Sequence, residues 1–70
     1  MLTFEITIGD RTLPISKFTL GLLGLEEEGQ LEREDYTPLL RDLRRHGAGL
    51  VADTIERANP RSIKWGRVVV

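Results

Sequence analysis

The sequence predicts a small α+β domain in which an N-terminal β-hairpin and a C-terminal strand flank two to three helices. Two observations favour this class. Apolar and polar residues alternate near both ends of the chain, and residues 36–59 show helical periodicity with start and stop signals. The 70 residues suit a single domain, residues 1–70. The expected order is β-β-α-α-α-β, and the last strand can join the hairpin in one sheet.

The N-terminal hairpin is predicted from the alternation of apolar and polar side chains over residues 2–8. Residues 9–11, Gly-Asp-Arg, supply a turn. Residues 12–15 can return as a short second strand. Pro14 has no N–H to donate to a β-ladder, so this strand is expected to be brief or to lie at an edge of the sheet.

A first helix is expected over residues 17–28, with Ser16 as its N-cap. Gly29 marks the predicted end. The glutamates at 26–28 oppose the helix dipole at that end, because the helix C-terminus carries partial negative charge. Residues 30–35 are polar and mostly acidic, and we interpret them as a linker.

Two further helices are predicted between residues 36 and 59. Thr37 precedes a proline and suits an N-cap, and Gly47 suits the left-handed residue that closes a helix. The next helix begins at residue 48 or 49 and stops before Pro60. One continuous helix is the alternative, but its two interior glycines would cost about 1 kcal/mol each relative to alanine. We therefore favour two helices joined by a tight turn.

The C-terminal segment alternates Ile63 and Trp65 with polar residues, as in a strand, and Gly66 suggests a bulge or a close contact. Val68, Val69 and Val70 follow, and we expect them to be paired in a sheet or covered by a partner. The inward positions of all these elements form a predicted core that consists of Phe4, Ile6, Leu39, Leu43, Leu50, Val51, Ile55 and Trp65.

Composition excludes several classes of site. The chain has no cysteine, so disulfides, thiolate metal sites and cysteine nucleophiles are excluded. No apolar run approaches the roughly 18 residues that a membrane-spanning helix needs. We expect a cytoplasmic protein without a membrane partner.

Little in the sequence supports catalysis. His46 is the only histidine, and Asp42 lies one helical turn before it, so the two could form an ion pair. A general base oriented by a carboxylate has this spacing, but a surface pair or a C-capping histidine is the simpler interpretation, because no nucleophile accompanies it. The acidic residues between 26 and 35 lack the spacing of a calcium loop. We expect a protein that is not an enzyme and that has no metal or cofactor.

Charge is distributed unevenly along the chain. Residues 1–35 contain three basic and eight acidic residues, whereas residues 36–70 contain seven basic and three acidic ones. The basic half is a candidate surface for nucleic acid or an acidic partner. Its candidate residues are Arg41, Arg44, Arg45, Arg57, Arg61, Lys64 and Arg67. The predicted order of three helices followed by a strand is that of a helix-turn-helix domain with a wing. The third helix, however, has an apolar first turn and few side chains that could contact bases.

The opening FEITIGDRTLPISKFTLGLLGLEEEG, residues 4–29, resembles the start of small phage tail-assembly chaperones and related virion-assembly proteins. In those proteins a short hairpin leads into a helix rich in leucine and glutamate. Residues 39–60 are similar to the closing helices of death-effector-like and bacterial effector-associated adaptor domains, from which the β-rich ends depart. Both resemblances imply a binding role without an active site.

These observations together favour a non-enzymatic protein-interaction or assembly module that self-associates. A chain this short has a small core, the three C-terminal valines need cover, and the two halves carry complementary charge. Two alternatives stay open: a compact monomer whose last strand completes its own sheet, and a small helix-turn-helix-like protein that binds nucleic acid through its basic half.

Overall fold

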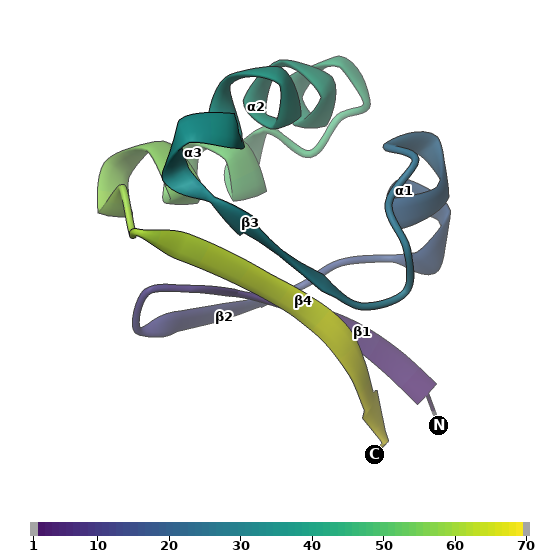
Figure 1. Ribbon diagram of the computed structural model, residues 1–70. Coiled ribbons are helices and arrows are strands. Elements are labelled where there is room, and N and C mark those ends of the chain that lie inside the picture. Colours follow the sequence, from purple (N-terminus) through teal and green to yellow (C-terminus); the bar gives the residue numbers. More distant parts are fainter. Residues whose placement is uncertain (1, 70) are drawn as a thin grey trace.

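The computed structural model describes residues 2–69, apart from the side chain of Leu2, and folds into two layers (Figure 1). One layer is an antiparallel sheet in the order β2-β1-β4-β3. The other consists of the helices, which all cover one face of the sheet. The strands are β1 (Leu2–Ile8), β2 (Arg11–Pro14), β3 (Gly29–Glu32) and β4 (Ser62–Val69). The predicted α+β class is confirmed, and the last strand does join the N-terminal hairpin.

The first and last strands form the centre of the sheet. In the β1–β4 ladder Ile6 lies opposite Trp65, and Ile8 lies opposite Ile63. All four side chains are buried beneath the helices. Pro14 lies in β2, the strand at one edge of the described sheet, so the expected edge position of this strand is confirmed.

Strand β3 replaces the predicted linker. Residues 29–32 pair with β4, Gly29 opposite Trp65 and Leu31 opposite Ile63. Only Leu31 turns an apolar side chain toward the core, so the strand has no alternating pattern that a sequence would reveal. A short 3-10 helix, η1 (Arg33–Asp35), follows directly. The order is therefore β-β-α-β-α-α-β, with one strand more than predicted.

Helix α1 (Lys17–Leu22) is shorter than the predicted helix, which extended to Glu28. Gly24 adopts a left-handed conformation with a φ of 70°, and the N–H of Leu25 donates to the C=O of Leu20 at 2.9 Å. This is the Schellman arrangement, in which a glycine closes the helix and the following apolar residue folds back against it. The three glutamates consequently lie in the loop beyond the helix, where they do not oppose its dipole.

The predicted helix starts have different outcomes. Ser16 is the N-cap of α1, and its hydroxyl accepts a hydrogen bond from the N–H of Thr19 at 3.0 Å, which confirms the prediction. The N-cap prediction for Thr37 is wrong, because α2 (Tyr36–Arg45) continues directly from η1 and begins two residues before Pro38, the predicted first residue. Pro38 still lies in the first turn, where its missing N–H costs no helical hydrogen bond.

Two helices, rather than one, occupy the region of the glycines. Gly47 has a φ of 79°, and the N–H of Ala48 donates to the C=O of Leu43 at 2.8 Å. The same Schellman arrangement therefore ends α2, and α3 (Gly49–Ala58) begins immediately afterwards. The predicted break at Gly47 is confirmed.

The core contains seven of the eight predicted residues. Leu50 is the exception, with 73% of its surface exposed. On α3 the buried positions are Val51, Ala52, Thr54 and Ile55, so the buried face is turned away from Leu50 and toward Ala52. The seven confirmed residues are Phe4, Ile6, Leu39, Leu43, Val51, Ile55 and Trp65.

Gly66 forms neither a bulge nor a close contact. It lies opposite Glu5 in the regular β1–β4 register, and a Cβ added to it would be 3.6 Å from the Cβ of Glu28. The close contact occurs at Gly29 instead, where an added Cβ would lie 2.6 Å from Cζ2 of Trp65. Glycine at 29 therefore lets the edge strand pack directly on the indole ring.

The connection between α3 and β4 is held by side chains from the η1–α2 segment. The Tyr36 hydroxyl donates to the C=O of Pro60 at 2.8 Å, and the Arg33 guanidinium donates to the C=O of Asn59 at 2.7 Å. Burial raises the pKa of the Tyr36 phenol, so it remains a hydrogen-bond donor throughout the neutral range. Arg33, a base within an acidic segment, thus bonds a carbonyl at the C-terminal end of α3.

Candidate interaction surface

The two central strands project beyond the two edge strands at one end of the sheet. The β2 ladder stops where Pro14 lies opposite Glu5, and the β3 ladder stops where Gly29 lies opposite Trp65. Residues 2–4 of β1 and 66–69 of β4 continue as a two-stranded ribbon, which we name the sheet end. Figure 1 shows it extending away from the helices, with the start of β1 and the end of β4 side by side.

The sheet end leaves backbone groups without a strand partner on the side of β3. In an antiparallel ladder, alternate residues direct their N–H and C=O groups to opposite neighbours. The Ile15 N–H donates to the C=O of Phe4, so the even-numbered residues of β1 face β2 and the odd-numbered ones face β4. Thr3 and its β4 partner Val68 therefore face one another. Arg67 and Val69 consequently face the side of β3, which does not extend that far.

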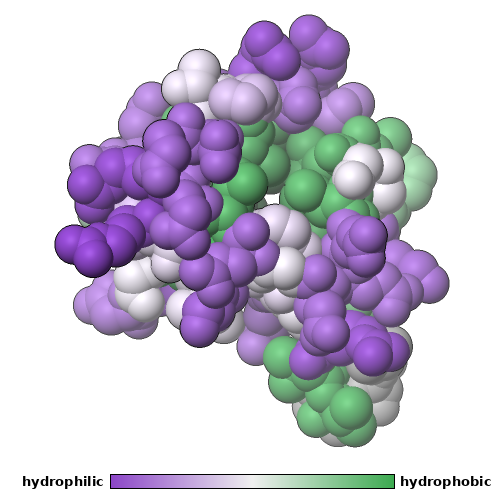
Figure 2. Space-filling model, in the orientation of Figure 1, coloured by the Kyte–Doolittle hydropathy of each residue, from purple (hydrophilic) through white to green (hydrophobic). Residues whose placement is uncertain are grey.

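The sheet end also exposes apolar side chains. Val69 is 85% exposed and Val68 is 36% exposed. Figure 2 shows hydrophobic surface at this end of the molecule and again over α1, where Phe18 and Leu22 are exposed. Both described valines are paired in the sheet, as expected, while Val70 lies outside the described residues.

The other parts of the two sheet edges carry features that discourage pairing with a further strand. Strand β2 is short and includes Pro14, which cannot donate a hydrogen bond. Strand β3 presents Gln30 and Glu32, whose side chains bond one another at 2.9 Å on the exposed edge. Short strands, prolines and charged side chains are common protections of sheet edges. At Val69 the described edge has none of them.

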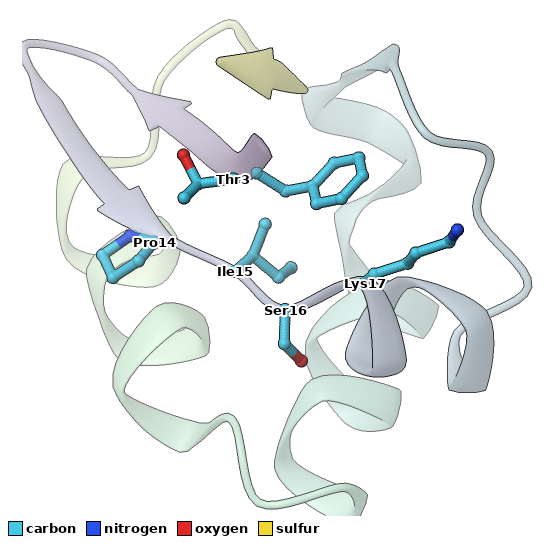
Figure 3. Close-up of a pocket in the computed structure, with 6 residues that line it drawn as sticks. Thr3, Pro14, Ile15, Ser16 and Lys17 are labelled. Carbon is cyan, nitrogen blue, oxygen red and sulfur yellow. The ribbon is translucent and has the colours of Figure 1, made fainter. Parts of the chain in front are cut away.

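A hollow of about 520 Å³ lies where the chain leaves β2 for α1 (Figure 3). Phe4, Pro14 and Ile15 give it a mainly apolar lining, and Lys17 stands at its rim. The hollow borders the β1 side of the sheet end, because Phe4 lines the hollow and is also part of the sheet end. Nothing in the sequence pattern predicts this hollow, because it forms where β2 separates from β1.

A second hollow, of about 270 Å³, lies between α3 and the start of β2. Its lining includes the exposed Leu50 together with Arg11 and Arg57. Asp53 also lines it, but its carboxylate accepts a hydrogen bond from Arg44 at 2.7 Å. This bond raises the pKa of the Arg44 guanidinium, which also bonds Glu56 at 2.9 Å.

The seven candidate basic residues do not share one surface. Arg44 is engaged by two carboxylates of α3. Lys64 and Arg67 lie three positions apart in β4, so their side chains project from opposite faces of the sheet. Arg67 lies 3.8 Å from Glu27 on the helix-covered side. The remaining residues, all exposed, are Arg41 and Arg45 on α2, Arg57 on α3, and Arg61 before β4.

The other sequence candidates also have definite positions. His46 is exposed and caps the C-terminus of α2, whereas the carboxylate of Asp42 lies 3.6 Å from Arg41. Within residues 2–69, no ion pair joins His46 to Asp42, and no cluster of three or more potential metal ligands occurs. None of the helices described is long and apolar enough to cross a bilayer.

Comparisons with known proteins found no similarity: no protein-family model matches the chain, and neither a curated protein nor a solved structure does.

Proposed function

We propose that this protein is a non-enzymatic interaction module that self-associates through the sheet end. The open β-edge at the sheet end, where Val69 is 85% exposed, is the observation that carries the proposal. Open strand edges pair readily with further strands, since each such pairing satisfies a row of N–H and C=O groups. An assembly role is also what the resemblance of residues 4–29 implies.

The kind of surface favours a protein partner over nucleic acid. Val68 and Val69 provide the apolar contact that a protein interface buries at its centre. The basic residues are distributed over several faces, and Arg44 is already paired, so they offer no continuous track for a phosphate backbone. Self-association is also consistent with a 70-residue domain, whose own core is small.

Light scattering coupled to size-exclusion chromatography tests the proposal. We expect a mass above the 7.9 kDa monomer that rises with protein concentration from about 10 μM to 1 mM, the range in which small interfaces associate. An apolar contact should persist or strengthen between about 0.05 and 0.5 M salt, whereas a contact between charged surfaces should weaken. A monomer mass under every condition would overturn self-association.

Two matched variants locate the contact. Val69→Lys places a charge on the open edge and is expected to give a monomer. Leu50→Lys makes the same kind of change at an exposed leucine of α3, 73% exposed, and should leave association unchanged. The opposite pattern would place the interface at α3 and contradict the proposal. Salt-sensitive binding of duplex DNA by both variants, without self-association, would instead support the nucleic-acid alternative.

A further inference from the structure

We infer that the partner of the sheet end is the same edge of a second copy, and that two β4 strands pair antiparallel about a twofold axis that passes between their Val68 residues. This inference rests on the self-association proposed above and adds its register and symmetry. In this arrangement Val68 of one copy faces Val68 of the other. Arg67 of each copy lies opposite Val69 of the other.

The available edge limits the possible registers. The chain before β3 passes beside Gly66, since a Cβ there would be 3.6 Å from the Cβ of Glu28. The open edge on this side therefore begins at Arg67 and extends to Val69 within the described residues. Arg67 and Val69 direct their N–H and C=O groups outward. A self-pairing in which these two positions exchange hydrogen bonds between copies is centred on the residue between them, Val68.

Charge favours the same register. A ladder centred on Arg67 would place the two guanidiniums directly opposite one another, and like charges in that position destabilise a strand pair. Centring on Val68 places each Arg67 opposite a valine and leaves it beside its own Glu27, 3.8 Å away. In a ladder centred on Val69, Arg67 would have no partner within the described residues, so fewer residues of the open edge would be paired.

Packing favours it as well. Val68 occupies the sheet face that the helices leave uncovered, where its β1 partner is Thr3. In the inferred ladder the two Val68 residues form a non-hydrogen-bonded pair, the type in which side chains approach most closely. Valine pairs suit such positions, because β-branched side chains pack well across strands. The pairing extends the sheet from four strands to eight.

Cysteine trapping tests the register directly, because the chain has no native cysteine. In the inferred ladder the two Cα atoms at position 68 lie about 4.5 Å apart, within the range that a disulfide spans. The two residues at position 69 are offset by about 7 Å along the strands, at roughly 3.4 Å per residue, and with the strand spacing of about 4.8 Å their Cα atoms lie about 8 Å apart. A disulfide does not span that distance without movement of the backbone. Val68→Cys should therefore form a disulfide-linked dimer under air with a copper–phenanthroline catalyst.

Val69→Cys is the matched control. It lies on the same strand and is more exposed, 85% against 36%, so random collisions would oxidise it at least as fast. We expect Val68→Cys to dimerise at least about fivefold faster, because only its thiols reach disulfide distance in the associated state. A mixture of Arg67→Cys and Val69→Cys should give the mixed dimer in preference to either homodimer.

The outcomes separate this inference from the function on which it rests. If Val69→Cys is trapped as fast as Val68→Cys while the unmodified protein still associates and Val69→Lys does not, the register is wrong and self-association through the sheet end stands. If the unmodified protein is a monomer and neither variant is trapped, both fail. Selective trapping of Val68→Cys, with an unchanged circular dichroism spectrum, supports both.

Discussion

The indole ring of Trp65 lies against the backbone of Gly29, where a Cβ would come within 2.6 Å of Cζ2. The indole Nε1–H also donates to the C=O of Glu26 at 3.0 Å. One buried side chain of β4 therefore fixes both the start of β3 and the loop that precedes it. The loop carrying the glutamates at 26–28 is held in place although all three are exposed.

Gly29→Ala is expected to destabilise the domain by about 1–3 kcal/mol, because the added methyl group meets a buried aromatic ring that has little room to move. Urea denaturation followed by tryptophan fluorescence measures the change. Gly66→Ala is the matched control in the neighbouring strand, where the added Cβ would lie 3.6 Å from the Cβ of Glu28, an ordinary contact. It should be neutral or stabilise by up to about 1 kcal/mol, since alanine loses less conformational entropy. Equal effects of the two substitutions would contradict this account of Gly29.

Leu43→Ala should cost about 2–5 kcal/mol, since Leu43 is 1% exposed and its removal leaves a cavity in the core. In a domain of 70 residues this loss is large enough to abolish folding. Leu50→Ala, at the exposed start of α3, should change the unfolding free energy by less than about 0.5 kcal/mol. A cost below about 0.5 kcal/mol at position 43 would show that α2 turns a different face to the core.

The two glycines between α2 and α3 should respond differently to alanine. Gly47 has a φ of 79°, so Gly47→Ala should cost about 1–2 kcal/mol, the strain of a left-handed L-residue. Gly49 is the first residue of α3 and its added Cβ would meet nothing within 4 Å. Gly49→Ala should therefore be neutral or stabilise by up to about 1 kcal/mol. Thermal unfolding of the two variants measures both changes in stability. A stabilising effect of Gly47→Ala would be incompatible with the observed end of α2.

Tyr36→Phe should change how stability depends on pH in the alkaline range. Burial raises the pKa of the folded phenol above its usual 10.0, so the unfolded chain ionises first as pH rises. Stability from this group is therefore fully present below about pH 10 and is lost as pH rises through the folded pKa. At pH 7 the variant should be weaker by about 1 kcal/mol, the value of the hydrogen bond to Pro60. The difference from the unmodified protein should narrow above pH 10, and a constant difference would count against the assignment.

The elements whose signals are local could be predicted from the sequence. Ser16 caps α1 through its own hydroxyl, and Gly47 ends α2 through its own backbone freedom, so both follow from the residue at that position. The alternation in residues 2–8 and 62–65 likewise reports a buried sheet face directly. Gly24 closes α1 by the same means as Gly47, but the glutamates that follow it looked like a continuation of the helix.

The features that depend on distant residues could not be predicted. Residues 29–32 form a strand because they pair with β4 and because Gly29 packs on the indole ring of Trp65. Neither interaction can be inferred from the composition of residues 29–32. Leu50 and Val51 are adjacent apolar residues, and only the packing of α3 on the sheet decides which is buried. The valine run predicted a segment that is paired in a sheet or covered by a partner, whereas the open backbone groups beside it depend on where β3 stops.

The central position of the first and last strands has a consequence for synthesis of the protein. During translation β1 and β2 leave the ribosome early, but the partner that completes the centre of the sheet, β4, is made some 60 residues later, after every helix. Until residues 62–69 emerge, Ile6 and Ile8 have no strand on their second side and the helices have only part of a sheet to cover. Pairing of strands so distant in sequence is slow, because the intervening chain must first be closed into a loop. We therefore expect nascent chains stalled before residue 62 to remain protease-sensitive, and resistance to appear only once β4 has cleared the exit tunnel.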